Sequence, residues 1–179
     1  MPNLSLFGPF QLYLYFYEDM GKIIIKEVKT QEDLMNFIKF PMSLYKGNDN
    51  FVPSLINDEK EIWDSKENPA LSYSDSKQFL AFKSNTIVGR IAVMINHKEA
   101  QELNIKKVRF GWIDFIDDLE VSKALIQCAI NYAKENQIDK VEGPMGFTNL
   151  DKAGMLTMGF EKLATMIGIY NFPYYPQHL

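Results

Sequence analysis

The chain has 179 residues, of which 46% are hydrophobic and 23% charged, and this composition is typical of one globular domain with its own core. It excludes an intrinsically disordered chain and a fibrous repeat. The 19 Lys and Arg are outnumbered by 23 Asp and Glu, so the net charge of -4 argues against broad binding to nucleic acid or to anionic membranes.

Residues 1–19 differ from the rest because they hold six aromatic side chains and no Lys or Arg. They lack the basic region of a secretory signal and the uninterrupted apolar run of a membrane helix. Residues 10–17 predict a short strand with two apolar faces, which something must cover. Alternatively Met20 is the natural start and residues 1–19 are an aromatic-rich extension. Both interpretations stay open, and residues 20–179 form the predicted domain.

The next segment predicts a strand followed by a helix. Residues 22–28 have the β-rich composition of a first strand. Thr30 and Asp33 have the spacing of a capping box, which predicts a helix from there through Phe40. Pro41 is expected to end that helix.

A loop-rich region and three further strands are expected next. Residues 43–76 carry frequent Gly, Asn, Asp, Ser and Pro, which predicts loops with one or two short helices. Residues 78–83 and 87–96 predict an antiparallel hairpin. Residues 97–104 indicate a polar helix or turn, and residues 108–116 a further strand rich in aromatic side chains.

The clearest helix is expected at residues 118–136, because its apolar side chains recur on one face. The stripe consists of Val121, Leu125, Cys128, Ala129, Tyr132 and Ala133. Residues 140–143 predict a short strand after it. A helical crossover between this strand and residues 108–116 makes the two strands parallel. The fold class is therefore α/β with a mixed sheet.

Five phrases of the sequence carry a resemblance to a known superfamily. They are NDNFVPSLINDEK at 48–60, FLAFKSNTIVGRIAVMIN at 79–96, FGWIDFIDD at 110–118, VEGPMGFTNLDKAGML at 141–156 and YNFPYY at 170–175. In this order they resemble the GCN5-related N-acetyltransferase (GNAT) superfamily. More narrowly they resemble a bacterial GNAT-like group without an assigned function, whose chains usually continue well beyond this length.

The resemblance implies the acyl-CoA N-acyltransferase fold, with acetyl-CoA or another acyl-CoA as co-substrate and an amine as acceptor. The co-substrate would enter the gap between strands 108–116 and 140–143. Its pantetheine would pair with backbone near Ile113, Asp114 and Phe115. Its pyrophosphate would lie at the N-terminus of the following helix, because free backbone N–H groups favour an anion there, with help from Ser122 and Lys123.

The turn before that helix departs from the superfamily pattern, which places an Arg/Gln-x-x-Gly-x-Gly/Ala sequence there. This chain has Ile-Asp-Asp-Leu-Glu-Val-Ser at 116–122, with no glycine and with carboxylates at Asp117, Asp118 and Glu120. Their charges oppose a pyrophosphate. Asp117 as N-cap, with Glu120 three residues on, is expected to satisfy the free donors of the helix instead.

Acyl transfer to an amine needs a base and an acid near the leaving thiolate. Asp114 and Glu142 are the candidate bases, with a solvated or ion-paired strand carboxylate as the alternative for each. Tyr174 and Tyr175 are the candidate acids, with packing against neighbouring prolines as the alternative. Asn149 and Asp151 are candidate substrate contacts, with helix capping as their alternative.

Metal and nucleophile chemistry has little support in the sequence. The two histidines, His97 and His178, lie far apart, so no metal site is expected. Cys128 is the one cysteine and lies on an apolar helix stripe, which indicates a buried hydrophobic side chain. A single cysteine excludes an internal disulfide and favours a reducing compartment, so we expect a cytoplasmic protein.

The favoured hypothesis is an N-acyltransferase that moves an acyl group from acyl-CoA to a small-molecule or peptide amine. The alternative is a non-catalytic GNAT-like domain that packs against another domain or mediates protein interaction. The closing strands expected of the superfamily are not found after residue 178. The sequence therefore predicts a truncated domain with an open sheet edge, and leaves a homodimer or a missing C-terminal half as partner.

Overall fold

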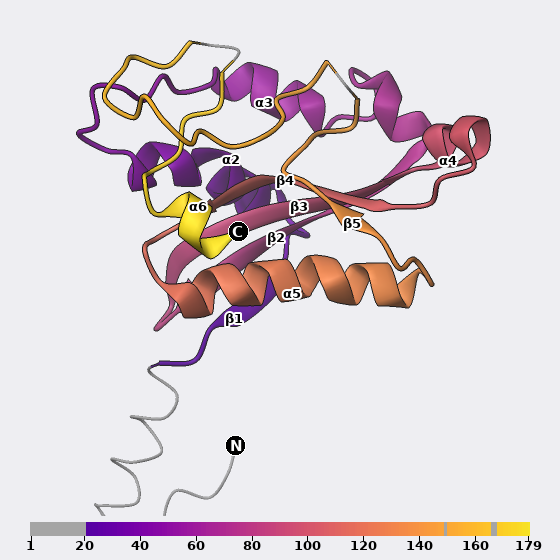
Figure 1. Cartoon of the computed structure of the whole chain (residues 1–179), viewed down its shortest axis with the longest axis horizontal. Coiled ribbons are helices and arrows are strands. Elements are labelled where there is room, and N and C mark those ends of the chain that lie inside the picture. Colours follow the sequence, from indigo (N-terminus) through magenta and orange to yellow (C-terminus); the bar gives the residue numbers. More distant parts are fainter. Residues whose placement is uncertain (1–20, 149, 166–167) are drawn as a thin grey trace, which may run out of the picture.

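The structure is a computed structural model, and it describes residues 21–148, 150–165 and 168–179. The predicted strand at residues 10–17 and the extension at 1–19 lie outside this part. The described chain forms a five-stranded sheet in the order β1-β2-β3-β4-β5 (Figure 1). The strands are β1 (Ile24–Glu27), β2 (Ser74–Lys83), β3 (Thr86–Asn96), β4 (Val108–Phe115) and β5 (Val141–Glu142).

The first four strands pair antiparallel, whereas β4 and β5 are parallel. The predicted hairpin is confirmed as β2 and β3. Its turn residues Ser84 and Asn85 have φ of 48° and 65°, and two consecutive positive φ angles are typical of the tight turn whose twist matches the flanking strands. The predicted parallel crossover through the long helix is also confirmed.

Helix α2 (Gln31–Leu44) begins with the predicted capping box, in which Thr30 and Asp33 each accept a backbone N–H of the other. The expectation that Pro41 ends the helix is wrong, because Pro41 lies inside it. A proline cannot donate to the carbonyl four residues earlier. Arg90 Nη1 donates to that carbonyl, Phe37 O, at 2.9 Å, so a side chain from the sheet replaces the missing helix bond.

The remaining helices are short except one. They are α3 (Ile56–Ile62), the 3-10 turn η2 (Pro69–Ser72), α4 (His97–Leu103), α5 (Leu119–Glu135) and α6 (Tyr175–His178). The expected N-cap of α5 is corrected from Asp117 to Asp118, whose side chain accepts from Glu120 N at 2.9 Å. Asp118 is favoured as the N-cap because its Oδ2 also forms an ion pair with Lys83 Nζ at 2.7 Å.

The sheet lies between two helical layers, with α5 on one face and α2 and α3 on the other (Figure 1). Alternate side chains of β3 fill the two cores. Ile91 and Val93 pack toward α5, and Ala92 and Met94 pack toward α2. All four are fully buried, so both faces of the central strand are covered.

β5 pairs with β4 over only two residues, after which the chain leaves the sheet. The described residues between 144 and 174 then run over the α2 and α3 side before α6 returns to β4 (Figure 1). Within the described residues no strand follows β5, and the sheet is open. The mixed α/β fold class is confirmed, and the strand order with its parallel β4 and β5 is that implied by the GNAT resemblance.

Candidate functional site

Strand β4 changes its alternation through a β-bulge. Two residues, Trp112 and Ile113, stand opposite the single residue Ile91 of β3, and Trp112 has φ of 46°. Such backbone is strained for a bulky side chain and is concentrated at functional sites. As a result Phe110 and Phe115 both join the α5 core although they lie an odd number of positions, five, apart in the strand. Trp112 and Asp114 point to the other face.

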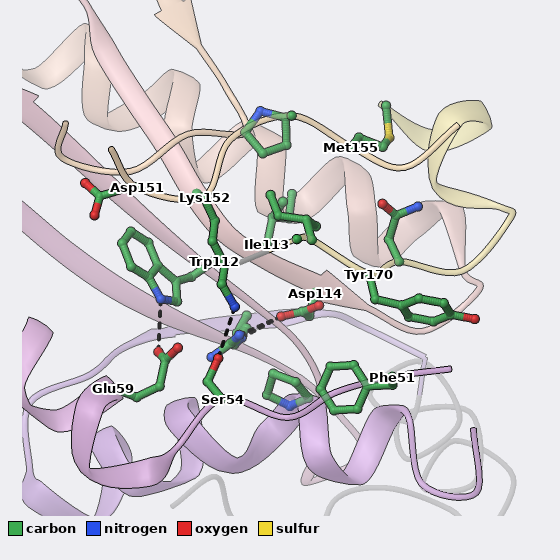
Figure 2. A pocket seen from close by; sticks show the side chains of 18 of the residues that line it. Phe51, Ser54, Glu59, Trp112, Ile113, Asp114, Asp151, Lys152, Met155 and Tyr170 are labelled. Atoms are coloured by element: carbon green, nitrogen blue, oxygen red, sulfur yellow. Dashed lines mark hydrogen bonds and ion pairs between the residues drawn. The ribbon is translucent and has the colours of Figure 1, made fainter. Parts of the chain in front are cut away.

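A cavity of about 370 Å³ lies on that other face of β4 (Figure 2). Its wall is built by α2, α3, β4 and residues 144–171, and its lining includes the labelled side chains of Phe51, Glu59, Ile113 and Met155. The size is in the range of ligand sites, which are mostly apolar with a few placed polar groups.

Asp114 lies at the floor of the cavity and is held by three side chains. Its Oδ2 pairs with Arg90, at 2.8 Å from Nε and 2.7 Å from Nη2. Its Oδ1 accepts from Tyr45 Oη at 2.9 Å and from Tyr175 Oη at 3.4 Å. All four residues are at most 8% exposed. Burial raises the pKa of Tyr45 and Tyr175 above their ordinary value, so both hydroxyls stay protonated as donors.

Glu59 of α3 is a second carboxylate on the cavity wall. It is 9% exposed and accepts from Trp112 Nε1 at 3.1 Å (Figure 2). Trp63 packs on the Trp112 ring with centroids 4.8 Å apart. Among the described residues no Lys, Arg or His lies within 4.0 Å of the Glu59 carboxylate. Glu59 thus differs from Asp114, which has its own cation.

The predicted substrate residue Asp151 also lines the cavity, but its carboxylate accepts from Thr148 N and Oγ1 within its own loop. Asn149, the other predicted substrate residue, lies outside the described residues. Next to Asp151, Lys152 Nζ donates to Ser54 Oγ at 3.2 Å (Figure 2). This contact joins the loop after β5 to the loop before α3.

On the edge of β4 that β5 leaves free, two tyrosines bond the backbone of Phe115. Tyr174 Oη donates to Phe115 O at 2.6 Å, and Phe115 N donates to Tyr175 Oη at 3.1 Å. The Tyr175 ring stacks on the Phe115 ring with centroids 4.2 Å apart. The predicted acids Tyr174 and Tyr175 are therefore bound at the position where the resemblance implies a pantetheine.

The start of α5 is contacted by His178. Its Nδ1 lies 3.0 Å from Ser122 Oγ, and its Nε2 lies 3.2 Å from Asp117 Oδ1. Ser122 is fully buried, whereas the Lys123 side chain is 68% exposed and lies 3.8 Å from Glu120. The predicted pyrophosphate ligands Ser122 and Lys123 therefore point to different surroundings. Only Ser122 faces the space between Phe115 of β4 and the first turn of α5, which we name the groove.

The groove between β4 and α5 does not fit acyl-CoA in this structure. Both backbone groups of Phe115 already have side-chain partners, Tyr174 and Tyr175. The helix N-terminus is capped by Asp118, and Asp117 and His178 lie beside it. A pantetheine would have to displace two hydroxyls, and a pyrophosphate would meet two carboxylates.

Glu142, the other predicted base, is not brought to the cavity. Its carboxylate pairs with Lys107 at 3.0 Å and Lys140 at 3.5 Å, where β4 and β5 begin. The hydrogen bond from Lys107 lowers the pKa of Glu142 below its ordinary value. Glu142 is thus an ion-paired carboxylate at the edge of the sheet.

Sequence reasoning missed Tyr45, Glu59, Arg90 and Trp112 as site residues. One signal for the bulge at Trp112 was present in Gly111, the residue before it, because an isolated glycine in a strand suggests a bulge or a close backbone approach. A second signal was the proline inside a capped helix, which needs an outside donor for the carbonyl that it leaves free. Arg90, an arginine in an otherwise apolar strand, is that donor.

The described residues contain no group of three or more His, Cys, Asp or Glu placed to hold a metal ion. None of their helices has the length and hydropathy needed to cross a bilayer. Cys128 was expected to be buried and is half-buried, and this burial raises the pKa of its thiol to about 12.

Comparisons with known proteins give one curated relative and several solved structures, and no family model matches. Protein YghO of Escherichia coli is 30% identical over 156 residues, which are 87% of this chain and 40% of that protein. The chain thus spans about two fifths of the length of its curated relative.

Three of the similar solved structures carry acetyltransferase names. The glucosamine-6-phosphate N-acetyltransferase of Arabidopsis thaliana is 13% identical, with a TM-score of 0.46 over 68% of this chain and 80% of that one. A predicted acetyltransferase with acetyl-CoA from Clostridium acetobutylicum is 13% identical, with a TM-score of 0.45 over 68% and 79%. The ribosomal-protein-alanine N-acetyltransferase of Brucella melitensis is 14% identical, with 0.44 over 66% and 77%.

Proposed function

We propose that this chain is a GNAT-like domain that binds a small molecule with a primary ammonium group in the cavity beside β4. The observation that carries the proposal is Glu59, a buried carboxylate on the cavity wall with no cation of the protein near it among the described residues. An unpaired buried charge is costly, so a cationic ligand gains by neutralising it.

The rest of the cavity favours an ammonium group over an anion. Its described acidic residues are Glu59, Asp114 and Asp151, and its described basic residues are Arg90 and Lys152. Arg90 is already paired with Asp114, and Lys152 lies against Ser54. The wall is otherwise rich in aromatic and aliphatic side chains, which suits a ligand with an apolar body.

Trp112 is expected to orient the Glu59 carboxylate. Its indole N–H donates to Glu59 Oε2, which leaves the remaining lone pairs of the carboxylate for an ammonium donor. The strained backbone of Trp112 holds the indole in this place. Charge-assisted hydrogen bonds of this kind are among the stronger contacts in ligand sites.

The proposal is tested by titrating phenethylamine and the uncharged 2-phenylethanol by isothermal calorimetry. The amine is expected to bind at least about tenfold more tightly, the factor expected for one charge-assisted hydrogen bond. Glu59→Gln removes the charge and should abolish this preference. Glu61→Gln, on the exposed side of α3, is the matched control and should keep it. Equal binding of both compounds to the unchanged protein contradicts the proposal.

N-acyl transfer to that amine is the second candidate. It is favoured by the position of the cavity, because Ile113 and Asp114 line it and the next residue, Phe115, lies in the groove where the resemblance implies an acyl-CoA. Asp114 and Tyr175 would then be the groups nearest the acceptor. Transfer requires Tyr174 and Tyr175 to leave the backbone of Phe115 first. If it occurs, thiol release from acetyl-CoA in the presence of phenethylamine is lost in Asp114→Asn but kept in Asp139→Asn. No thiol release with either protein contradicts transfer and leaves amine binding intact.

A further inference from the structure

We propose that residues 174–178 are an intramolecular occupant of the groove between β4 and α5, and that they exclude a pantetheine thioester from it. This inference does not rest on amine binding, although Tyr175 belongs to both regions, since it lines the cavity and its hydroxyl accepts from Phe115 N. It concerns the co-substrate side alone, where the residues present do not fit the acyl-CoA that the fold implies.

The first argument is the backbone of Phe115. An exposed strand edge offers N–H and C=O groups to an added extended chain. Here one residue of that edge has both groups filled, by Tyr175 Oη at 3.1 Å and Tyr174 Oη at 2.6 Å. Two neighbouring hydroxyls thus make the pair of bonds that the amide groups of a pantetheine would make.

The second argument is the packing of the segment. The Tyr175 side chain is 2% exposed and its ring stacks on the Phe115 ring. The His178 ring also stacks on Phe115, with the two ring centroids 5.3 Å apart. Burial raises the pKa of the Tyr174 hydroxyl, which keeps its proton on the bond to Phe115 O. The segment therefore fills the apolar floor of the groove as well as its polar edge.

The third argument is the far end of the groove. His178 lies 3.0 Å from Ser122 Oγ and 3.2 Å from Asp117 Oδ1, so one ring spans the first turn of α5. The chain just before the segment is held as well, because the buried Asn171 accepts from Leu156 N at 2.7 Å and donates to Leu156 O at 3.1 Å. The segment is thus held at His178 and, three residues before its start, at Asn171.

The test uses S-acetylpantetheine, which lacks the diphosphate, so that the carboxylates at the start of α5 do not decide the result. Binding is followed by NMR on the Phe115 amide. The groove-opening variant is Tyr174→Phe with His178→Ala, which removes one hydroxyl and one ring contact. The matched control is Tyr73→Phe with His97→Ala, the same two changes at the residue before β2 and the residue after β3.

The groove-opening variant is expected to bind the probe at least about tenfold more tightly than the unchanged protein, because the competing hydrogen bonds are lost. The control should bind like the unchanged protein. Equal affinity of all three proteins overturns the proposal, and so does tight binding to the unchanged protein.

A second measurement keeps the proposal testable if the variant does not fold. In the unchanged protein, nuclear Overhauser contacts between the rings of Phe115 and Tyr175 are expected from their 4.2 Å separation. Their absence overturns the proposal, and so does saturable binding of S-acetylpantetheine at Phe115 that leaves these contacts in place. Failure of phenethylamine binding would affect only the proposed function, since no residue of this test contacts Glu59.

Discussion

The two sides of the last residues of β4 differ in what covers them. On the α2 and α3 side, Trp112 and Asp114 face a cavity of about 370 Å³. On the edge toward α5, the backbone and ring of Phe115 are covered by Tyr174 and Tyr175. One side of the strand is therefore open to a ligand, and the other is filled by the chain itself.

One strand thus presents an open cavity on one side and a filled groove on the other. The bulge at Trp112 shifts the alternation of β4, so that Trp112 packs on the cavity side while Phe110 and Phe115 pack toward α5, and the cavity and the groove share backbone but few side chains. Asp114 is the exception, because Tyr175 of the groove and Tyr45 of the cavity both bond its Oδ1. A substitution at a partner of Asp114 should therefore affect both sides of β4, whereas a substitution in the cavity or in the groove alone should affect one side.

The largest effect is expected from Arg90→Met, which leaves Asp114 as a buried charge without its cation. Breaking a buried pair costs about 3–5 kcal/mol, so the free energy of unfolding in urea should fall by about that amount. The same change also leaves the Phe37 carbonyl without its donor. Residues on both sides of β4 should therefore be destabilised together, because Asp114 bonds Tyr45 and Tyr175.

Lys77→Met is the matched control for Arg90→Met. Its pair with Glu27 at 3.5 Å is partly exposed, with 40% of the lysine side chain accessible, so the expected cost is within about 1 kcal/mol. If the two variants lose the same stability, Asp114 is not the common support of the two sides.

A somewhat smaller effect is expected from Gly111→Ala, which acts on the cavity side alone. A Cβ at Gly111 would lie 2.4 Å from the backbone oxygen of Met145, so the loop after β5 must move away from β4. Overpacking of this kind costs about 1–3 kcal/mol in thermal or chemical unfolding. Gly21→Ala, where nothing lies within 4 Å, should cost far less. An unchanged stability would mean that this close approach does not exist in solution.

On the groove side, Tyr175→Phe keeps the stacked ring but removes the acceptor of Phe115 N. An unsatisfied buried donor costs about 1–3 kcal/mol, and the free energy of unfolding should fall by about that amount because Phe115 and Tyr175 are both buried. Amide exchange of Phe115 should speed up. Tyr73→Phe serves as control, since its hydroxyl has no hydrogen-bond partner among the described residues. A protected Phe115 amide in Tyr175→Phe contradicts the filled edge.

The sequence predicted the elements better than the site because elements depend on local patterns. The capping box at Thr30, the stripe of α5 and the hairpin each follow from spacing within a few residues. The direction of Asp114 could not be predicted, because the bulge at Trp112 shifts the alternation by one residue, and Gly111 beside it indicates a bulge without giving the direction of the side chains that follow. The filling of the groove depends on contacts between residues about sixty positions apart, such as Phe115 and Tyr175.

The helix ends show where local rules gave the wrong residue. Pro41 was expected to end α2, but Arg90, distant in sequence, satisfies the carbonyl that the proline leaves free. Asp117 was expected as N-cap of α5, but Lys83 pairs with its neighbour Asp118 and His178 lies against Asp117. In both cases a tertiary partner decided between adjacent alternatives.

The smallest effect is a pH dependence at the start of α5. The hydrogen bond from Lys83 lowers the pKa of Asp118 in the folded state. A carboxyl group with a lowered pKa stabilises the fold above its unfolded pKa, and this stability is lost as the pH falls through the folded value. Unfolding in urea should therefore show a difference between unchanged protein and Asp118→Asn, within about 1 kcal/mol, that is larger at pH 6 than at pH 3. A difference that grows toward pH 3 contradicts this assignment.

The contrast between the open cavity and the filled groove is tested most directly by one NMR experiment with two resonances. Phenethylamine and S-acetylpantetheine are titrated in turn into the unchanged protein, and the Trp112 indole N–H and the Phe115 amide are followed. We predict that phenethylamine shifts the Trp112 signal, whereas S-acetylpantetheine at the same concentrations leaves the Phe115 signal unchanged. A saturable shift of Phe115 with no shift of Trp112 would contradict the account.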